Sequence, residues 1–391
     1  MQLLAPLADN MAKIGIDIRN IGKKRTGDEA VFFNLVKTLA QIDSKNEYSL
    51  FTDIIEKNVL EKIAENLGIN GKNNFKIIPI KTFNRFSWNF WSLAKYLKNN
   101  PVDVYHTQYI TPFFINKKIK IITTVHDISF NYFPQFIKLT DLIFLKNLMP
   151  ISLKRADIII AVSKFTRDEI IKYYKIDSNK VAYIYNAIED DFLKGSATKE
   201  ELEFLRSKYK LPESFVLYLG TMQPRKNLTA LVEAINKIKR ALPGFSLVLA
   251  GGSAYNFDTM IGKTIHRLDL SGDVIFPGYI PKEEKLALFK LASVYCMPSL
   301  YEGFGIPILE AMAAGIPVVA SDIIPHKEIA EDAALYFNIK DNNELAVNLQ
   351  KIIQDENMRS EMIARGIKQA AKFSWVASAK KLLAIYEKLG E

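Results

Sequence analysis

The sequence predicts an α/β protein made of two doubly wound, Rossmann-like domains that face a cleft. Three observations lead to this fold class. Short apolar, β-rich runs recur along the chain, amphipathic helical stretches separate them, and one polar interruption divides the series. Runs without polar alternation are typical of strands buried on both faces of a parallel sheet. Helices between such strands build repeated βαβ units.

The predicted strands form one group before the interruption and one after it. The first group lies at residues 13–18, 47–52, 75–80, 103–107, 119–125, 157–163 and 181–185. The second group lies at residues 215–220, 245–251, 274–278, 293–298, 316–322 and 334–338. Together these strands outnumber those of a typical open sheet, so two sheets are predicted.

The interruption, residues 189–213, is polar, contains a Gly-Ser pair and a Pro, and carries no strand. It is interpreted as a linker running into a helix. We therefore predict an N-terminal domain over 13–195 and a C-terminal domain over 196–372. Residues 373–391 have helical apolar spacing and are predicted to close one domain or to pack back on the N-terminal one.

Composition indicates a soluble globular protein, because about half of the residues are apolar and no run reaches the ~18 that a membrane span needs. The first ten residues lack the features of a secretory signal and are expected to lie outside the fold. The single cysteine, Cys296, cannot form an internal disulfide, and it sits in an apolar run. This favours a reducing cytoplasm.

The net charge of +9 is unevenly spread. Residues 1–195 hold 28 Lys and Arg against 20 Asp and Glu, whereas residues 196–391 hold 24 against 23. A basic half could face nucleic acid, an anionic membrane or an acidic substrate. A lysine-rich proteome would explain it equally well.

The stretch "YEGFGIPILEAMAAGIPVVASD" (301–322) places two carboxylates, Glu302 and Glu310, around the start of a predicted helix at about 307–314. A helix start favours an anion, and the small residues of Gly303-Phe304-Gly305 permit close backbone approach. Carboxylates there would suit paired hydroxyls. A nucleotide-sugar, with hydroxyl-rich rings on both sides of a diphosphate, explains both features.

A second element is "YLGTMQPRKN" (218–227), in which a buried strand ends at Gly220 and a helix begins near Asn227. Arg225 and Lys226 would flank that helix start and neutralise a diphosphate. The later "LAGGSAYN" (249–256) is a weaker signal, a strand that ends in glycines including Gly251.

In the first half, "IITTVHDISF" (121–130) sets His126 and Asp127 at the end of a buried strand, where ligands of such folds bind. A core histidine without a ligand is the alternative. The loop after the first strand carries Gly22 and Gly27 around Lys23, Lys24 and Arg25. Its glycines indicate close backbone approach.

These elements resemble glycosyltransferase family 4 over about residues 13–388, most specifically in the EX7E motif formed by Glu302 and Glu310. The resemblance implies that Glu302 contacts the donor sugar and that Glu310 binds the ribose. It implies a donor-binding role for Lys226, with Arg225 supplying the charge that many members place where Thr221 stands. It also implies a sugar-orienting His126 beside Asp127. The remaining donor contacts would come from Gly27, Gly220, Gly251, Gly303, Phe304, Gly305 and Ile306.

The resemblance implies a retaining GT-B glycosyltransferase of polysaccharide biosynthesis. The expected donor is GDP-mannose, with UDP-sugars as the alternative, and the acceptor a saccharide or a polyprenyl-linked saccharide. No cofactor, metal or nucleic acid is expected. Cytoplasmic location is expected, with peripheral contact to an anionic membrane through residues 80–98 and 136–155, unless both are ordinary helices. Other candidates are a GT-B epimerase or phosphorylase and a non-catalytic polyanion-binding protein.

Overall fold

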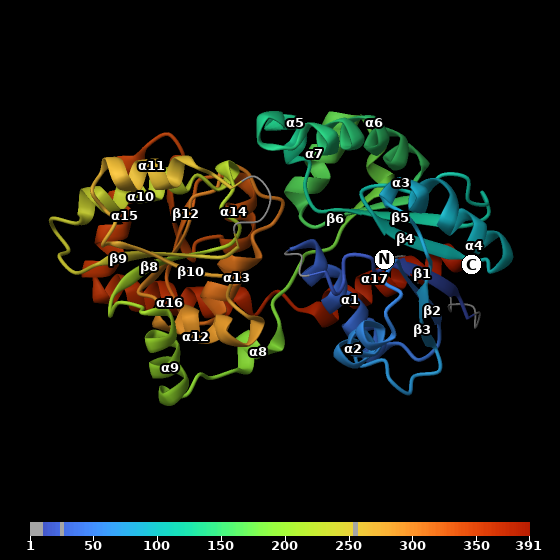
Figure 1. The fold of residues 1–391 in the computed structure, drawn as a ribbon, viewed down its shortest axis with the longest axis horizontal. Coiled ribbons are helices and arrows are strands. Elements are labelled where there is room, and N and C mark those ends of the chain that lie inside the picture. The colour runs from blue at the N-terminus through green and yellow to red at the C-terminus, as the bar shows by residue number, and fades with distance from the viewer. Residues whose placement is uncertain (1–10, 24–26, 253–256) are drawn as a thin grey trace, which may run out of the picture. The chain divides into compact units, whose positions relative to one another are not determined.

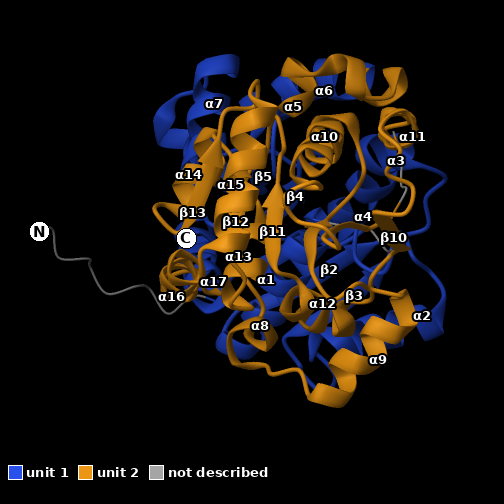
Figure 2. Ribbon diagram, turned by 90° about the vertical axis from the view of Figure 1, so that its left-hand side faces the viewer, with its two compact units in different colours: residues 1–128, 143–186, 375–391 blue, residues 129–142, 187–374 orange. Residues whose placement is uncertain are grey.

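The structure is a computed structural model that describes residues 11–23, 27–252 and 257–391. The chain divides into two compact units (Figure 2). Unit 1 contains the described residues up to Ile128, residues 143–186 and residues 375–391. Unit 2 contains residues 129–142 and 187–374.

The units begin and end at places that differ from the predicted domain boundaries of 195 and 372. The division falls earlier than 195 because the residues just after Asn186 pack on unit 2. Ile188 forms a parallel β-bridge with Ser374, and the ring of Phe192 lies 5.9 Å from that of Phe289. The polar stretch predicted as a linker, 189–213, contains two helices of unit 2.

Unit 1 is built on a seven-stranded sheet whose strands all run parallel, in the order β3-β2-β1-β4-β5-β6-β7. The strand order reverses between β1 and β4, so the carboxyl ends of these two strands border a topological switch point. The strands are β1 Lys13–Asp17, β2 Glu47–Thr52, β3 Phe75–Pro79, β4 Val104–Gln108, β5 Lys120–Val125, β6 Ile158–Ala161 and β7 Val181–Tyr183.

Unit 2 repeats this plan with a six-stranded parallel sheet in the order β10-β9-β8-β11-β12-β13. Its switch point lies between β8 and β11. The strands are β8 Phe215–Leu219, β9 Ser246–Ala250, β10 Val274–Gly278, β11 Val294–Met297, β12 Val318–Ser321 and β13 Ala334–Phe337.

Helices cover both faces of each sheet (Figure 1). In unit 1 they are α1 Asp28–Ile42, α2 Lys57–Leu67, α3 Arg85–Ser87, the π-helical turn η1 Trp88–Ser92, α4 Leu93–Asn99, most of α6 Leu139–Arg155, α7 Lys164–Tyr174, η3 Ser178–Lys180 and α17 Trp375–Gly390. In unit 2 they are α5 Ser129–Tyr132, η2 Pro134–Phe136, α8 Asp190–Lys194, α9 Lys199–Tyr209, η4 Pro224–Lys226, α10 Leu228–Ile238, α11 Met260–Arg267, η5 Lys282–Glu284, α12 Lys285–Leu291, α13 Ile306–Ala313, α14 Ile324–Ala330, α15 Asn342–Gln354 and α16 Glu356–Ala370.

The predicted fold class, two doubly wound parallel sheets, is confirmed. Every run predicted as a strand coincides with an observed strand, with ends that differ by at most two residues. The reason is burial on both faces: β8 is buried along its whole length, and so are β11 and β12. Such strands must be apolar at consecutive positions.

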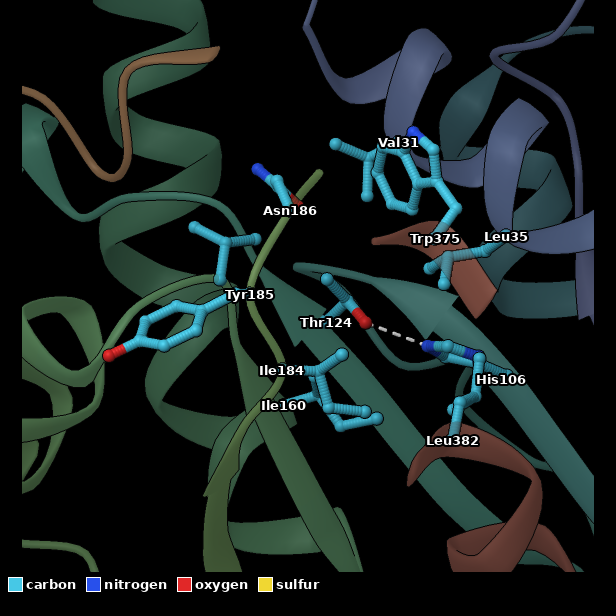
Figure 3. A pocket seen from close by; sticks show the side chains of 11 residues that line it. Val31, Leu35, His106, Thr124, Ile160, Ile184, Tyr185, Asn186, Trp375 and Leu382 are labelled. Atoms are coloured by element: carbon cyan, nitrogen blue, oxygen red, sulfur yellow. Dashed lines mark hydrogen bonds between the residues drawn. The ribbon is translucent and has the colours of Figure 1, made fainter. Parts of the chain in front are cut away.

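The last helix, α17, belongs to unit 1, where it packs against α1 and β4. The phenolic oxygen of Tyr386, which is fully buried, lies 2.6 Å from Nδ1 of His106 on β4. The other ring nitrogen of His106 lies 2.7 Å from Oγ1 of Thr124. Figure 3 shows this imidazole beside a small cavity that Trp375 and Leu382 of α17 help to line. The helix is therefore an integral layer of unit 1.

Candidate active site

The acidic residue at the centre of the unit 2 site is Glu302, in the loop between β11 and α13. The basic residues Arg225 and Lys226 end η4, which follows β8. Because β8 and β11 are neighbours, the two loops leave the sheet side by side at its switch point. A backbone hydrogen bond from Leu300 N–H to the carbonyl of Arg225, 2.9 Å, joins them.

Glu302 is buried and forms an ion pair with each of the two basic residues. Lys226 Nζ donates to Oε1 at 2.5 Å, and Arg225 Nη1 donates to Oε2 at 3.2 Å. Arg225 Nη1 also donates to the carbonyl of Tyr301. Sequence reasoning assigned these three residues to one site, and the structure brings their charged atoms into contact.

Positive charge outweighs negative charge in this cluster, which lies near the helix start that the sequence predicted as an anion site. Burial alone would raise the pKa of Glu302, but the charges of Lys226 and Arg225 outweigh it and hold this pKa at about 2. Glu302 is therefore ionised at neutral pH. With one carboxylate between two cations, the cluster keeps a net positive charge that can still attract a diphosphate.

Glu310 lies one turn inside α13 and is also buried. Lys285 Nζ, from α12, donates to its Oε1 at 3.4 Å, and the charge of Glu310 raises the pKa of that lysine. The helix spans Ile306–Ala313, one residue earlier than predicted, with Pro307 in its first turn. Both acidic residues of the EX7E motif thus have a basic partner.

The connecting loop, residues 303–306, owes its shape to one glycine and one aromatic ring. Gly305 caps α13 with φ of 113°, a backbone conformation that glycine adopts without strain. The side chain of Phe304 is buried against Phe373, with ring centroids 5.8 Å apart. Phe304 can therefore contact a ligand only through its backbone, whereas Ile306 is half-buried at the first helical position.

Gly251 is required by the contact between β8 and β9, whereas a Cβ on Gly220 would meet the hydroxyl of Tyr218 on its own strand, β8. A Cβ on Gly251 would lie 1.9 Å from the carbonyl oxygen of Gly220, and Gly251 has φ of 135°. Gly220 N–H donates to the carbonyl of Ala250 at 3.0 Å. Packing alone explains Gly251. Of the predicted loop 249–256, residues 253–256 lie outside the described residues.

Sequence reasoning missed His326, which lies in α14 beneath this site. Its Nδ1 donates to the carbonyl of Ser321 at 3.1 Å, and Ser321 Oγ donates to the carbonyl of Ser299 at 2.6 Å. These bonds tie the carboxyl ends of β11 and β12 together. The signal was available: "SDIIPHK" follows a strand end, as "HD" does in the first half.

In unit 1, His126 follows β5 and is half-buried. Its Nε2 donates to Oε1 of Gln108 at 2.9 Å, because that oxygen also accepts from Asn20 Nδ2. Asn20 in turn donates to Asp28 at 2.9 Å. Burial lowers the pKa of His126, while Asp28 and Asp127 act in the opposite direction. The ring is therefore neutral at pH 7 and fixed in orientation.

Gly27 and Asp127 lie at the same carboxyl edge of the unit 1 sheet as His126. Gly27, with φ of 62°, precedes α1, and a Cβ there would meet no atom within 4 Å. Its left-handed backbone, rather than crowding, favours glycine. Of the basic residues in this loop, Lys23 pairs with Asp53 at 2.6 Å, and Lys24 and Arg25 lie outside the described residues.

Two further searches cover only the part of the chain that the structure describes. Within it, no group of three or more His, Cys, Asp or Glu side chains is placed to hold a metal ion. No described helix has both the length and the apolar character that crossing a bilayer takes.

Comparisons with known proteins agree with this geometry. The family model for glycosyl transferases group 1 matches residues 201–369, and the model for Glycosyltransferase Family 4 matches residues 26–192. O-antigen chain mannosyltransferase B of Escherichia coli is 32% identical over 272 residues, which cover 69% of this chain and 71% of that protein. O-antigen chain mannosyltransferase RfbU of Salmonella typhimurium is 25% identical over 381 residues, covering 93% and 99%.

Among solved structures, a glycosyltransferase from Rickettsia africae superposes with a TM-score of 0.75 at 20% identity, covering 97% of this chain and 99% of that one. The fold and the sequence matches together define a glycosyltransferase of the GT-B class. The chain belongs to glycosyltransferase family 4, as its EX7E motif indicated.

The buried imidazole of His326 predicts a pH dependence of stability. Burial lowers its pKa from 6.5 to about 4, although the charge of Glu302 raises it. Below pH 6.5 the unfolded chain binds a proton that the folded chain excludes, so stability falls as the pH drops. Between pH 7 and 5 the loss from this group should be on the order of 2 kcal/mol. Over the same pH range, the free energy of unfolding of the variant His326→Gln should fall by that much less than the free energy of unfolding of the parent protein.

Urea unfolding at both pH values, followed by hydrogen exchange of unit 2 peptides, measures this loss. The matched control is His266→Gln, an exposed histidine on α11 of the same unit. It should keep the full pH dependence of the parent protein. An unchanged dependence in His326→Gln would contradict the assignment.

Proposed function

We propose that this glycosyltransferase transfers a hexose from a nucleotide-sugar to a saccharide or lipid-linked saccharide acceptor, with retention of the anomeric configuration. The observation that carries the proposal is the buried cluster of Glu302, Arg225 and Lys226 beside the start of α13. Such a cluster offers cations for a diphosphate and a carboxylate for sugar hydroxyls. Mannose from GDP-mannose is the proposed donor, because the relatives at 32% and 25% identity are mannosyltransferases.

In the proposed reaction the bond between the anomeric carbon and the diphosphate oxygen breaks, and the electron pair leaves with the nucleoside diphosphate. Arg225 and Lys226 stabilise the charge that develops on it. The acceptor hydroxyl attacks the same face, and its proton passes to the departing phosphate oxygen. The carboxylate of Glu302 holds the sugar, while Glu310 accepts from the ribose hydroxyls.

His126 has a positioning role in this proposal. Its neutral ring is fixed by Gln108 and can accept a hydrogen bond at Nδ1 from a sugar hydroxyl.

The proposed reaction needs no metal ion, because side-chain cations and the N–H groups of α13 would face the leaving group. Added EDTA should therefore leave the initial rate unchanged within about twofold, whereas a strict Mg²⁺ or Mn²⁺ requirement would refute the metal-free mechanism.

A donor screen tests the proposal as a whole. The purified chain is incubated with GDP-mannose, other GDP-sugars and UDP-sugars, and the released diphosphate is followed. Turnover of GDP-mannose above all others is the expected result. Preference for a UDP-sugar would correct the donor, and the absence of turnover with any nucleotide-sugar would refute the function.

The two glutamates should differ in effect. Glu310→Gln should weaken nucleotide diphosphate binding about tenfold to a hundredfold, since a hydrogen bond to a charged group contributes ~1.5–3 kcal/mol. Glu302→Gln should slow turnover of the whole donor far more than it weakens binding of the bare nucleotide. Calorimetry and initial rates measure the two quantities. Equal effects on both would argue against this division of roles.

The basic pair should matter for rate. Lys226→Ala and Arg225→Ala should each lower turnover at least ~100-fold, as loss of one donor to a developing oxyanion does. Lys226→Arg should restore only part of the rate, because the planar guanidinium presents its charge differently. Lys263→Ala, an exposed lysine of α11, is the matched control and should retain the parent rate. Near-normal rates in both site variants would exclude this loop from the mechanism.

A further inference from the structure

A set of aromatic side chains is exposed on unit 1. Phe83 is 95% exposed, Phe114 74%, Trp91 64% and Phe86 47%. Large apolar side chains exposed singly need no explanation, but a contiguous group marks an interaction surface. These four residues, together with Phe90 and Phe113, are called the aromatic patch below.

Four rings of the aromatic patch are contiguous although they come from two segments of the chain: Phe90, Trp91, Phe113 and Phe114. The ring of Phe86 contacts Phe144 instead, with centroids 5.1 Å apart. Phe90 stacks on Phe113 with ring centroids 4.5 Å apart and planes 2° from parallel. Phe90 also lies 5.7 Å from Trp91 and 6.3 Å from Phe114. A backbone hydrogen bond from Phe113 N–H to the carbonyl of Asn89, 2.7 Å, fixes the two segments to each other.

The backbone beneath the aromatic patch is well anchored. Asn84 caps α3, and its side chain accepts from the N–H groups of Phe86 and Ser87. Trp88 of η1 is fully buried, with the guanidinium of Arg19 4.4 Å from its ring. Arg19 is held by Asp17 at the end of β1. The exposed rings therefore project from an ordered platform and not from a free loop.

The charge around the aromatic patch is almost entirely positive. Residues 80–118 contain six Lys and Arg and a single acidic residue, Asp103. The basic side chains are exposed: Lys81, Arg85, Lys95, Lys98, Lys117 and Lys118. Apolar rings among cations complement a surface that is both apolar and anionic. The interface of a bilayer with acidic lipids has both properties.

The aromatic patch lies at the carboxyl edge of the unit 1 sheet. The segment from Ile80 to Ser92 follows the carboxyl end of β3, and the loop with Phe113 and Phe114 follows that of β4. This is the edge of the unit 1 sheet at which His126 and Gly27 also lie.

We propose that the aromatic patch and its basic surround dock unit 1 on the surface of an anionic bilayer. Phe83, Trp91 and Phe114 enter the headgroup region, and Lys117, Lys118 and Arg85 face lipid phosphates. The indole of Trp91 favours this region because it is partly apolar and partly polar, and Phe rings serve as the apolar part of surfaces that bury themselves at the headgroup boundary. The role of this docking rests on the proposed function, since docking would present a lipid-linked acceptor to the sheet edge. The residues that form the surface all belong to unit 1.

Vesicle sedimentation of the full chain tests the proposal. The protein should bind phosphatidylcholine vesicles that contain phosphatidylglycerol at low salt, and much less at about 0.5 M salt, which screens exposed charges. Binding to pure phosphatidylcholine should be at least about tenfold weaker. No binding to the anionic vesicles, or equal binding to both kinds, would overturn it.

Two sets of variants locate the surface. The triple variant Phe83→Ser, Trp91→Ser, Phe114→Ser and the double variant Lys117→Glu, Lys118→Glu should each bind at least about tenfold more weakly. The matched controls lie on unit 2: Phe204→Ser, which removes a ring that is 63% exposed, and Lys263→Glu with Lys290→Glu. These should bind within about twofold of the parent. Equal losses in the controls would overturn the proposed surface.

Donor turnover with a short soluble saccharide acceptor separates this proposal from the proposed function. The aromatic patch variants should keep the parent rate in that assay, because they alter no residue of the donor cluster. If the chain binds anionic vesicles through this surface but turns over no donor, the proposed function fails and the docking surface stands. If the chain turns over donor but does not bind anionic vesicles, the docking surface fails and the proposed function stands.

Discussion

The interaction on which the candidate site of unit 2 depends is the buried ion pair between Glu302 and the two cations of η4. Its partners lie 76 and 77 residues apart in sequence. They meet only because β8 and β11 are neighbours in the sheet. Removing one partner of a buried pair leaves an uncompensated charge, which is strongly destabilising. The same contact therefore fixes two loops, keeps Glu302 ionised and leaves one positive charge for a ligand.

The two units place different kinds of side chain at equivalent positions of their sheets. Each places its candidate site residues at the carboxyl edge of a parallel sheet, near the point where strand order reverses. In unit 2 these side chains are charged and balanced in an ion pair network. In unit 1 hydrogen bonds through Gln108 and Asn20 connect the neutral ring of His126 to the carboxylate of Asp28. A neutral imidazole held through one ring nitrogen can accept from a hydroxyl group at the other, and charged groups are suited to a diphosphate.

Sequence reasoning predicted the fold almost completely, because strands buried on both faces must be apolar without interruption. It also grouped Glu302 with Arg225 and Lys226, which the structure brings into contact, since these residues stand in local patterns of Gly, Pro and helix starts. It could not predict which charges pair. Lys285, the partner of Glu310, lies on a helix with no distinctive pattern. His326 was missed because its bonds join strand ends that are adjacent only in the sheet. Unit boundaries were placed by composition, whereas packing of Ile188 and Phe192 decides them.

The contact between α17 and β4 bears on how the chain is made. Tyr386 contacts His106, which precedes it by 280 residues in the sequence. Residues 187–374, which belong to unit 2, are synthesised after the last strand of unit 1 and before α17. Domains generally fold as their residues leave the ribosome. Unit 2 can thus complete its core while unit 1 still lacks its final layer, with the apolar faces of α1 and β4 uncovered. Synthesis of α17, rather than emergence of the first sheet, completes unit 1.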